Sequence, residues 1–197
     1  MNSAFTIVKD ISQLIETLNA VKTKIMLITK DEKKKKDFKI VINNEEIKHS
    51  RKLKVVGNTI NDCLNWNNML TVGVDSLVNQ LKARNHQLKF ITKYLDKDMK
   101  KKVVNSVFKG KLLFGIEQWG GGTKENLNKV ESELKKAAKL ALGKEFSNKS
   151  DRQRFNQLKW MTLGNEITFA NQQATHKILN RKIPEGMSSL MPMNSNH

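Results

Sequence analysis

The spacing of apolar residues changes at Trp66, and this change restricts the possible fold more than any other sequence feature. Before Trp66, short runs of aliphatic and β-branched residues alternate with polar residues, which is typical of strands. After Trp66, apolar residues recur at spacings of three, four and seven, which is typical of amphipathic helices. The sequence therefore predicts an α+β fold, in which a short N-terminal helix and a small antiparallel β-meander precede a basic helical bundle.

The first part of the chain is expected to contain one helix and several strands. Residues 8–18 place four apolar side chains on one helical face. Strands are predicted over 23–29, 38–49 and 52–57. The second of these ranges turns at Asn43-Asn44, because asparagine tolerates a positive φ. Together the strands are expected to form one antiparallel meander.

A run of charged residues, "KDEKKKKDF", separates the first two predicted strands at residues 30–38. It has no apolar residue before Phe38, so nothing in it marks a side that would be buried. We interpret the run as a solvated loop.

Two helices are expected next, each with one apolar face. The first includes Gly73 as a tolerated weak point, and its apolar face holds Leu70, Val74, Leu77, Leu81, Leu88 and Ile91. The apolar face of the second holds Met99, Val103, Val107 and Phe114. Asp96 in "YLDKD" is expected to cap this second helix, since an aspartate at a helix start interacts favourably with the helix dipole.

The glycines of "QWGGGT" must break the helical pattern before a third helix begins. Thr123 is the expected N-cap of that helix, and Gly143 is expected to end it. Residues 143–153 are interpreted as a linker. A turn at Leu163-Gly164 is then expected to precede a last helix that ends at Asn180.

The charge of the chain points to an anionic partner. Lys and Arg number 36 against 19 Asp and Glu, which gives a formal net charge of +17. Such an excess is expected of a protein that binds nucleic-acid phosphates, although a lysine-rich genome produces the same bias. An anionic membrane surface is a weaker alternative. The polar backs of the expected helices carry Lys82, Arg84, Lys89, Lys93, Lys97 and Lys100 to Lys102.

The location of the protein follows from three absences in the sequence. No apolar run is long enough to span a membrane, and the N-terminus has no apolar secretion signal. Cys63 is the single cysteine, which excludes an internal disulfide and fits a reducing compartment. We therefore expect a cytoplasmic or nuclear protein that is neither secreted nor a membrane protein.

The common signatures of enzyme active sites are missing. The chain has no phosphate-binding glycine loop, no G-x-S-x-G, H-E-x-x-H or C-x-x-C, and no adjacent pair of aspartates. The nearest approach to such a pair is Asp96 and Asp98, which a lysine separates. No resident metal ion or cofactor is therefore expected.

Five segments, in order, resemble the end of a reverse transcriptase from a non-LTR (LINE-like) retrotransposon. "LNAVKTKIML" resembles the family's L-N-x-x-K-T-x-x-M, and "VINNEEIKHSRKLKVVGNTINDCLNW" resembles its I-x-N-G-x-x-I, F-K-Y-L-G and I-x-x-x-L-x-W series. "VFKGKLLFGIEQWGG", "KKAAKLALG" and "LKWMTLGNEITFANQQATHKILNRKIPEGM" resemble the later L-x-Y-G-x-x-x-W-G, K-A-x-R-x-I-x-G and closing L-x-W-L-x-L-x-x-R segments. The resemblance covers roughly Leu18 to Met193.

The resemblance implies a domain order and a set of sites. Residues 1–60 would be a palm remnant, 61–146 a thumb-like helical region, 147–183 connector helices and 184–197 a flexible tail. Leu53, Lys54, Val55, Val56 and Gly57 match the primer grip. The expected nucleic-acid-binding residues are Lys22, Lys24, Lys54, Lys82, Arg84, Lys89, Lys93, Lys100, Lys101 and Lys102.

Several departures from the family pattern limit what the resemblance implies. The Tyr-x-Asp-Asp hairpin is absent, so Lys22, which matches a lysine beside the family's active site, has no reaction to assist. The primer-grip aromatic is replaced by Val55, and the glycine of the N-G turn by Asn44. A truncated copy, catalytically inactive alone, is therefore expected.

Three functions remain open from the sequence. The first is a reverse-transcriptase-derived fragment that binds phosphates of RNA or an RNA–DNA duplex without sequence preference. The second is a structural subunit of a ribonucleoprotein or another assembly, in which partner chains cover the exposed palm edge. The third is part of an RNA-directed DNA polymerase completed in trans, where Mg²⁺ would bind only if a partner supplied the missing aspartates.

Overall fold

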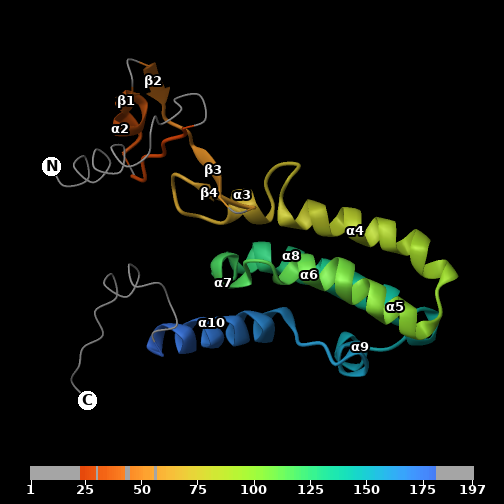
Figure 1. Cartoon of the computed structure of the whole chain (residues 1–197). Helices are drawn as coiled ribbons and strands as arrows, with labels where there is room; N and C mark the ends of the chain where they lie inside the picture. The colour runs from red at the N-terminus through yellow and green to blue at the C-terminus, as the bar shows by residue number, and fades with distance from the viewer. Residues whose placement is uncertain (1–22, 30, 43–44, 56, 181–197) are drawn as a thin grey trace. The chain divides into compact units, whose positions relative to one another are not determined.

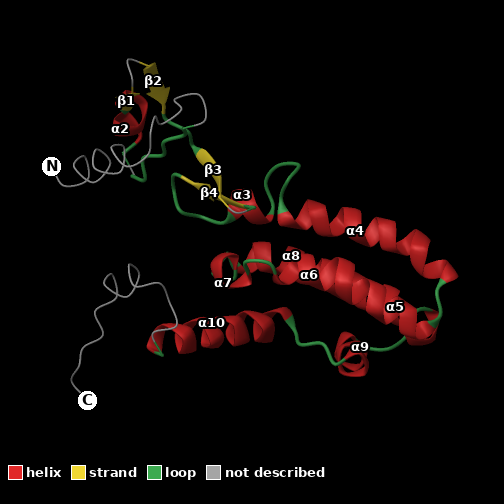
Figure 2. Cartoon of the chain, in the orientation of Figure 1, coloured by secondary structure: helices red, strands yellow, loops and turns green. Residues whose placement is uncertain are grey.

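The chain divides between Asn65 and Trp66 into two compact units. The computed structural model describes residues 23–29, 31–42, 45–55 and 57–180 (Figure 1). Strands lie in the first unit and a series of helices makes up the second, as Figure 2 shows by colour. The predicted α+β class, with small antiparallel sheets before a helical region, is confirmed.

The strands of the first unit pair as two separate hairpins. β1 (Lys39–Ile42) is antiparallel to β2 (Glu45–Lys48), and β3 (Lys52–Val55) is antiparallel to β4 (Asn58–Asn61). The two sheets thus take the place of one continuous meander. The sequence predicts no strand at the position of β4, because Gly57 marks the end of the last predicted strand.

The prediction of a strand over residues 23–29 is wrong. Ile25 forms only one isolated parallel bridge, with His49, and its carbonyl accepts a 2.7 Å hydrogen bond from the Ser50 backbone N–H. No neighbouring strand extends this bridge into a ladder among the described residues. The predicted helix at 8–18 and the Asn43-Asn44 turn lie outside the described residues.

The charged run is a helix rather than a solvated loop, so that prediction is also wrong. α2 (Glu32–Asp37) begins at Asp31, whose carboxylate accepts hydrogen bonds from the backbone N–H groups of Lys33 and Lys34. Acidic residues therefore stand at its start and lysines in its last turn, which complements the helix dipole. Lys35 in this helix is buried.

In the second unit, the first predicted long helix is interrupted. α3 (Asn67–Leu70) and α4 (Leu77–Ile91) are separated at Gly73, whose φ of +92° does not belong to a right-handed helix. The predicted face is right for Leu70, Leu77, Leu81 and Leu88, which are buried. It is wrong for Val74 and Ile91, which are exposed. After α4 comes the short 3-10 helix η1 (Thr92–Tyr94).

The second predicted helix contains a π-helical turn that changes its buried face. Asp96 caps α5 (Lys97–Val104) as expected, and the helix continues through the π-turn η2 (Asn105–Lys109) into α6 (Gly110–Leu113). The buried residues are Val104, Phe108 and Leu112. In the predicted face, Val103 and Val107 are half-buried, whereas Met99 and Phe114 are exposed.

The third predicted helix is confirmed at both ends and is central to the unit. α7 (Ile116–Trp119) ends at the predicted glycine break. α8 (Lys124–Leu142) follows, with Thr123 as its N-cap and Gly143 as its C-cap. The Thr123 hydroxyl accepts from the Asn126 N–H, and Gly143 adopts a φ of +75°. α8 contacts α3, α4, α5 and α9, and lies between α4 and α10 in Figure 1.

The last two helices begin at different places from those expected. After η3 (Lys144–Phe146), α9 (Asp151–Leu158) starts inside the predicted linker, where Ser150 and Gln153 form a capping box. The predicted turn at Leu163-Gly164 is wrong, because these residues form the first turn of α10 (Leu163–Leu179), capped by Thr162. The predicted end at Asn180 is confirmed. Within the described residues, no helix is long and apolar enough to span a bilayer.

Candidate nucleic-acid interface

A groove lined mainly by lysines runs along α4 and α8 to the end of α8. It consists of two hollows, of about 440 and 840 Å³, that share Lys89, Lys139 and Leu140. We call this surface the basic groove; its basic residues are Lys82, His86, Lys89, Lys93, Lys97, Lys100, Lys136, Lys139 and Lys144. Its acidic residues are Glu133 and Glu145.

Helical spacing brings these lysines together. Lys82, Lys89 and Lys93 are seven and four positions apart, so they lie on one side of α4 and η1. Lys136 and Lys139 are three apart on α8 and face them across the groove. The opposite side of α4 packs into the core through Leu81 and Leu88. The groove is therefore a consequence of the α4–α8 packing.

The remaining lysines belong to α5 and η3, which lie beside α8. Lys97 and Lys100 belong to α5, which packs on α8, and Lys144 belongs to η3, which directly follows Gly143. Lys139 and Lys144 lie near the C-terminal end of α8, where the helix dipole favours positive charge. Five elements thus contribute cations to this end of the groove: α4, η1, α5, α8 and η3.

The basic groove has many more cations than local anions can neutralise. Glu133 forms a 2.7 Å ion pair with Lys136, and Glu145 forms a 3.1 Å ion pair with Lys97. Within the described part of the chain, the other six lysines form no ion pair: Lys82, Lys89, Lys93, Lys100, Lys139 and Lys144. Like charges this close repel one another, so a bound polyanion would relieve that repulsion.

The structure brings together four of the ten predicted binding residues. Lys82, Lys89, Lys93 and Lys100 line the basic groove. Arg84 instead donates a 2.8 Å hydrogen bond to the Val107 carbonyl in the π-turn. The lysines at 101 and 102 do not line the groove, Lys24 and Lys54 belong to the first unit, and Lys22 lies outside the described residues.

The primer-grip-like segment forms a hairpin arm. Leu53, Lys54 and Val55 belong to β3, and pairing of Val55 with Asn58 leaves a two-residue turn that contains Gly57. Gly57 has a φ of +81°, which such turns favour in glycine. Leu53 is half-buried, and Lys54 and Val55 are exposed. Val56 lies outside the described residues.

Sequence reasoning missed three lysines of the basic groove, namely Lys136, Lys139 and Lys144, and also missed His86. The signal for the first two was present, because their positions alternate with the buried Ala137, Ala138 and Ala141 on the third helix. Lys144 follows the glycine that ends this helix, and its return toward α5 depends on the tertiary fold.

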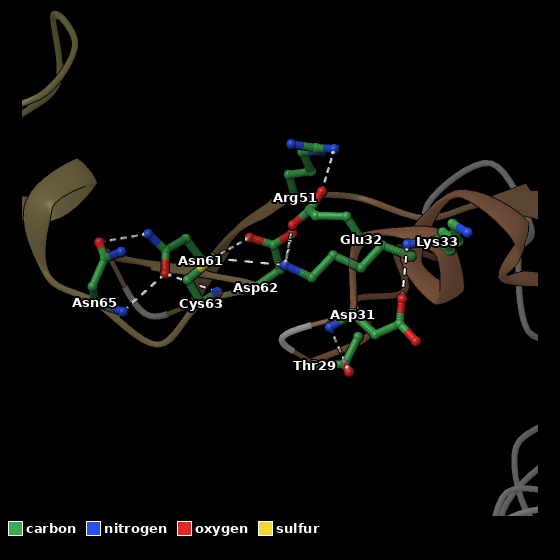
Figure 3. Close-up of polar contacts among 10 residues, drawn as sticks. Thr29, Asp31, Glu32, Lys33, Arg51, Asn61, Asp62, Cys63 and Asn65 are labelled. Atoms are coloured by element: carbon green, nitrogen blue, oxygen red, sulfur yellow. Dashed lines mark hydrogen bonds and ion pairs between the residues drawn. The ribbon is translucent and has the colours of Figure 1, made fainter.

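A second polar cluster, in the first unit, is structural in character. Lys35 on α2 lies 3.0 Å from Glu32 and 3.0 Å from Asp62, with Cys63 Sγ 3.6 Å away; Figure 3 labels these three partners of the Lys35 ammonium group. Arg51 also pairs with Glu32, at 3.0 Å. These contacts join α2 to the segment that follows β4, and Lys35 and Asp62 are both buried.

The pKa values in this cluster favour the charged forms. The hydrogen bond from Lys35 holds the pKa of Glu32 below its usual range. Burial opposes ionisation of Asp62, but hydrogen bonds from Lys35 and Cys63 outweigh it and lower the Asp62 pKa. The pKa of Lys35 is raised mainly by its hydrogen bond to Glu32 and, to a smaller extent, by its hydrogen bond to Asp62. No cluster of His, Cys, Asp and Glu suited to a metal ion occurs among the described residues.

No family model, curated protein or solved structure matches this chain at a significant level. The interpretation of the basic groove therefore depends on its own geometry and charge.

Proposed function

We propose that the helical unit binds RNA, or an RNA–DNA duplex, through backbone phosphates in the basic groove and without sequence preference. The observation that supports this proposal best is a single groove lined by six lysines, from α4, η1, α5, α8 and η3, that form no ion pair with any described residue. Phosphates are the anions that match an extended row of ammonium groups, and contacts to them carry no sequence information.

The proposal includes no catalysis by this chain alone. The sequence has no adjacent aspartate pair to hold the two metal ions of nucleotide transfer. The resemblance of five segments to a reverse transcriptase supports a duplex containing RNA as the first ligand to test. Primer extension with Mg²⁺ and the purified chain is therefore expected to yield no product, and a product would contradict this part of the proposal.

Salt dependence of binding tests the proposal. Affinity for a short labelled RNA–DNA hybrid is measured against salt concentration for the wild type and for the triple variant Lys89→Gln, Lys100→Gln and Lys139→Gln. Because each lost phosphate contact reduces the slope of log K against log salt by about 0.7 to 0.9, the triple variant is expected to have a clearly shallower slope.

A matched control distinguishes the loss of lysines in the groove from the loss of net charge in general. The triple variant Lys102→Gln, Lys124→Gln and Lys149→Gln removes the same charge from exposed positions that do not line the groove. It is expected to keep most of the affinity. Equal losses in the two triple variants, or an affinity that does not depend on salt, would contradict the proposal.

A further inference from the structure

Two aromatic rings beside the basic groove are exposed to an extent that protein packing does not explain. Phe90 on α4 and Tyr94 on η1 have exposed fractions of 53% and 88%. Aromatic side chains usually contribute to cores or interfaces, because each can remove a large apolar area from water. Tyr94 is the single tyrosine of the chain, and its exposed fraction shows that it contacts little of the described part of its unit.

The two rings lie next to the phosphate-binding lysines. Phe90 follows Lys89 and Tyr94 follows Lys93, so each ring is about 100 to 120° around the helix from a lysine of the basic groove. The Lys93 ammonium lies 5.5 Å from the centroid of the Phe90 ring. A phosphate held by either lysine would therefore place its own nucleotide within reach of a ring.

We infer that unpaired bases of a bound nucleic-acid strand stack on Phe90 and Tyr94, so that this edge of the basic groove is a single-strand site. The inference rests on the proposed function, because the lysines must hold the backbone. Every base has a π-face, so stacking on exposed rings that flank a basic groove binds single strands with little sequence preference. Charge complementarity and exposed rings thus favour the same occupant.

The spacing of the rings favours an unpaired strand over a duplex. Phe90 and Tyr94 are four positions apart, which is roughly 6 to 8 Å along the axis because α4 gives way to the 3-10 helix η1 between them. Successive bases within a duplex strand are about 3.4 Å apart and are already covered by their neighbours. Two rings at the wider spacing can each accept one base of an unstacked strand.

The Phe90 ring packs against another ring of α4. His86, one turn earlier on α4, meets it edge-on, with ring centroids 4.9 Å apart and planes inclined by 72°. His86 also lines the basic groove. This contact restricts the Phe90 ring on one side before any ligand binds, which reduces the entropy that is lost on binding.

Three probes of equal length test the inference: a thymidine single strand, the same strand without bases, and a duplex. The wild type is expected to bind the thymidine strand more tightly than the abasic strand, which keeps the phosphates but offers nothing to stack. The double variant Phe90→Leu and Tyr94→Leu is expected to weaken binding of the thymidine strand about fivefold or more. Its binding of the other two probes is expected to stay within about twofold.

Two control variants separate stacking from a general loss of structure. Phe90→Tyr combined with Tyr94→Phe keeps both rings and is expected to retain binding. Phe114→Leu combined with Phe169→Leu removes two exposed rings elsewhere in the unit and is expected to leave binding unchanged.

The possible results distinguish this inference from the proposed function. If the wild type binds the duplex and the abasic strand but shows no preference for bases, the stacking site is wrong and the phosphate groove stands. The same holds if the leucine variant weakens all three probes equally. If the wild type binds none of the probes, both proposals fail.

Discussion

Asn85 on α4 donates two hydrogen bonds to Glu133 on α8, one to its backbone carbonyl at 3.0 Å and one to its carboxylate at 2.9 Å. Both residues are buried, with exposed fractions of 7% and 2%, and both line the floor of the basic groove. This contact joins α4 to α8, two of the elements whose lysines line the groove.

Replacing Asn85 by alanine is expected to destabilise the helical unit by about 1 to 3 kcal/mol, because the buried Glu133 carboxylate loses its amide donor. Urea unfolding followed by tryptophan fluorescence measures this, since all three tryptophans belong to the second unit. Gln87→Ala, at an exposed position of the same helix, is the control and is expected to change stability little. Similar losses in the two variants would show that the hydrogen bonds matter little.

Lys35→Met is expected to destabilise the first unit, because it leaves Asp62 buried without its cationic partner. Lys34→Met, at an exposed position of the same helix, is expected to have little effect. Combining Lys35→Met with Asp62→Leu removes both charges and is expected to restore part of the stability. NMR signals of β3 and β4 followed in urea provide the measurement, and a double variant no better than Lys35→Met would contradict the argument.

Acid is expected to destabilise the first unit through Glu32 and Asp62. In the folded chain both carboxyl groups have pKa values below their usual range. As the pH falls below about 4, the unfolded chain takes up protons that the folded chain does not, so the free energy of unfolding decreases. Urea midpoints of the β3 and β4 NMR signals, compared between about pH 6 and pH 3, test this.

The variant Asp62→Asn isolates one of these carboxyl groups. It is expected to lower stability near neutral pH and to flatten the decrease in acid, because one group that titrates differently in the two states is gone. A pH dependence as steep as that of the wild type would assign the effect to other groups.

Alanine is expected to have opposite effects at two glycines of the helical unit. Gly143→Ala places a side chain at a φ of +75° and is expected to cost about 1 to 3 kcal/mol. Gly110→Ala, where helical backbone has open space around the new methyl group, is expected to stabilise by roughly 0.5 to 1 kcal/mol. Tryptophan fluorescence in urea measures both, and effects of the same sign would contradict the conformational argument.

Structural features that depend on residues within one helical turn could be predicted from the sequence. The caps at Asp96 and Thr123 and the end at Gly143 depend on hydrogen bonds or backbone angles between close neighbours, so local residue chemistry determines them. The α4 lysines of the basic groove were likewise found from their spacing. These predictions required no knowledge of what each helix packs against.

Structural features that depend on residues distant in the sequence could not be predicted from it. The burial of Lys35 requires Asp62, which follows another strand pair along the chain, so a run of four lysines looked solvated throughout. The shift of the buried face to Val104 and Phe108 depends on the π-turn, for which no simple sequence signal exists. The lysines of α8 gained their place in the groove only through packing against α4.

The π-turn at Asn105–Lys109 also bears on how the chain length can change during evolution. Gly110 N–H bonds to the Asn105 carbonyl, so this turn holds one residue more than an α-helical turn would. Removing one residue here would give a regular helix while leaving α5 and α6 in their present orientations. The same deletion within α8 would rotate every later side chain away from its contacts, so the two helices should differ sharply in their tolerance of deletions.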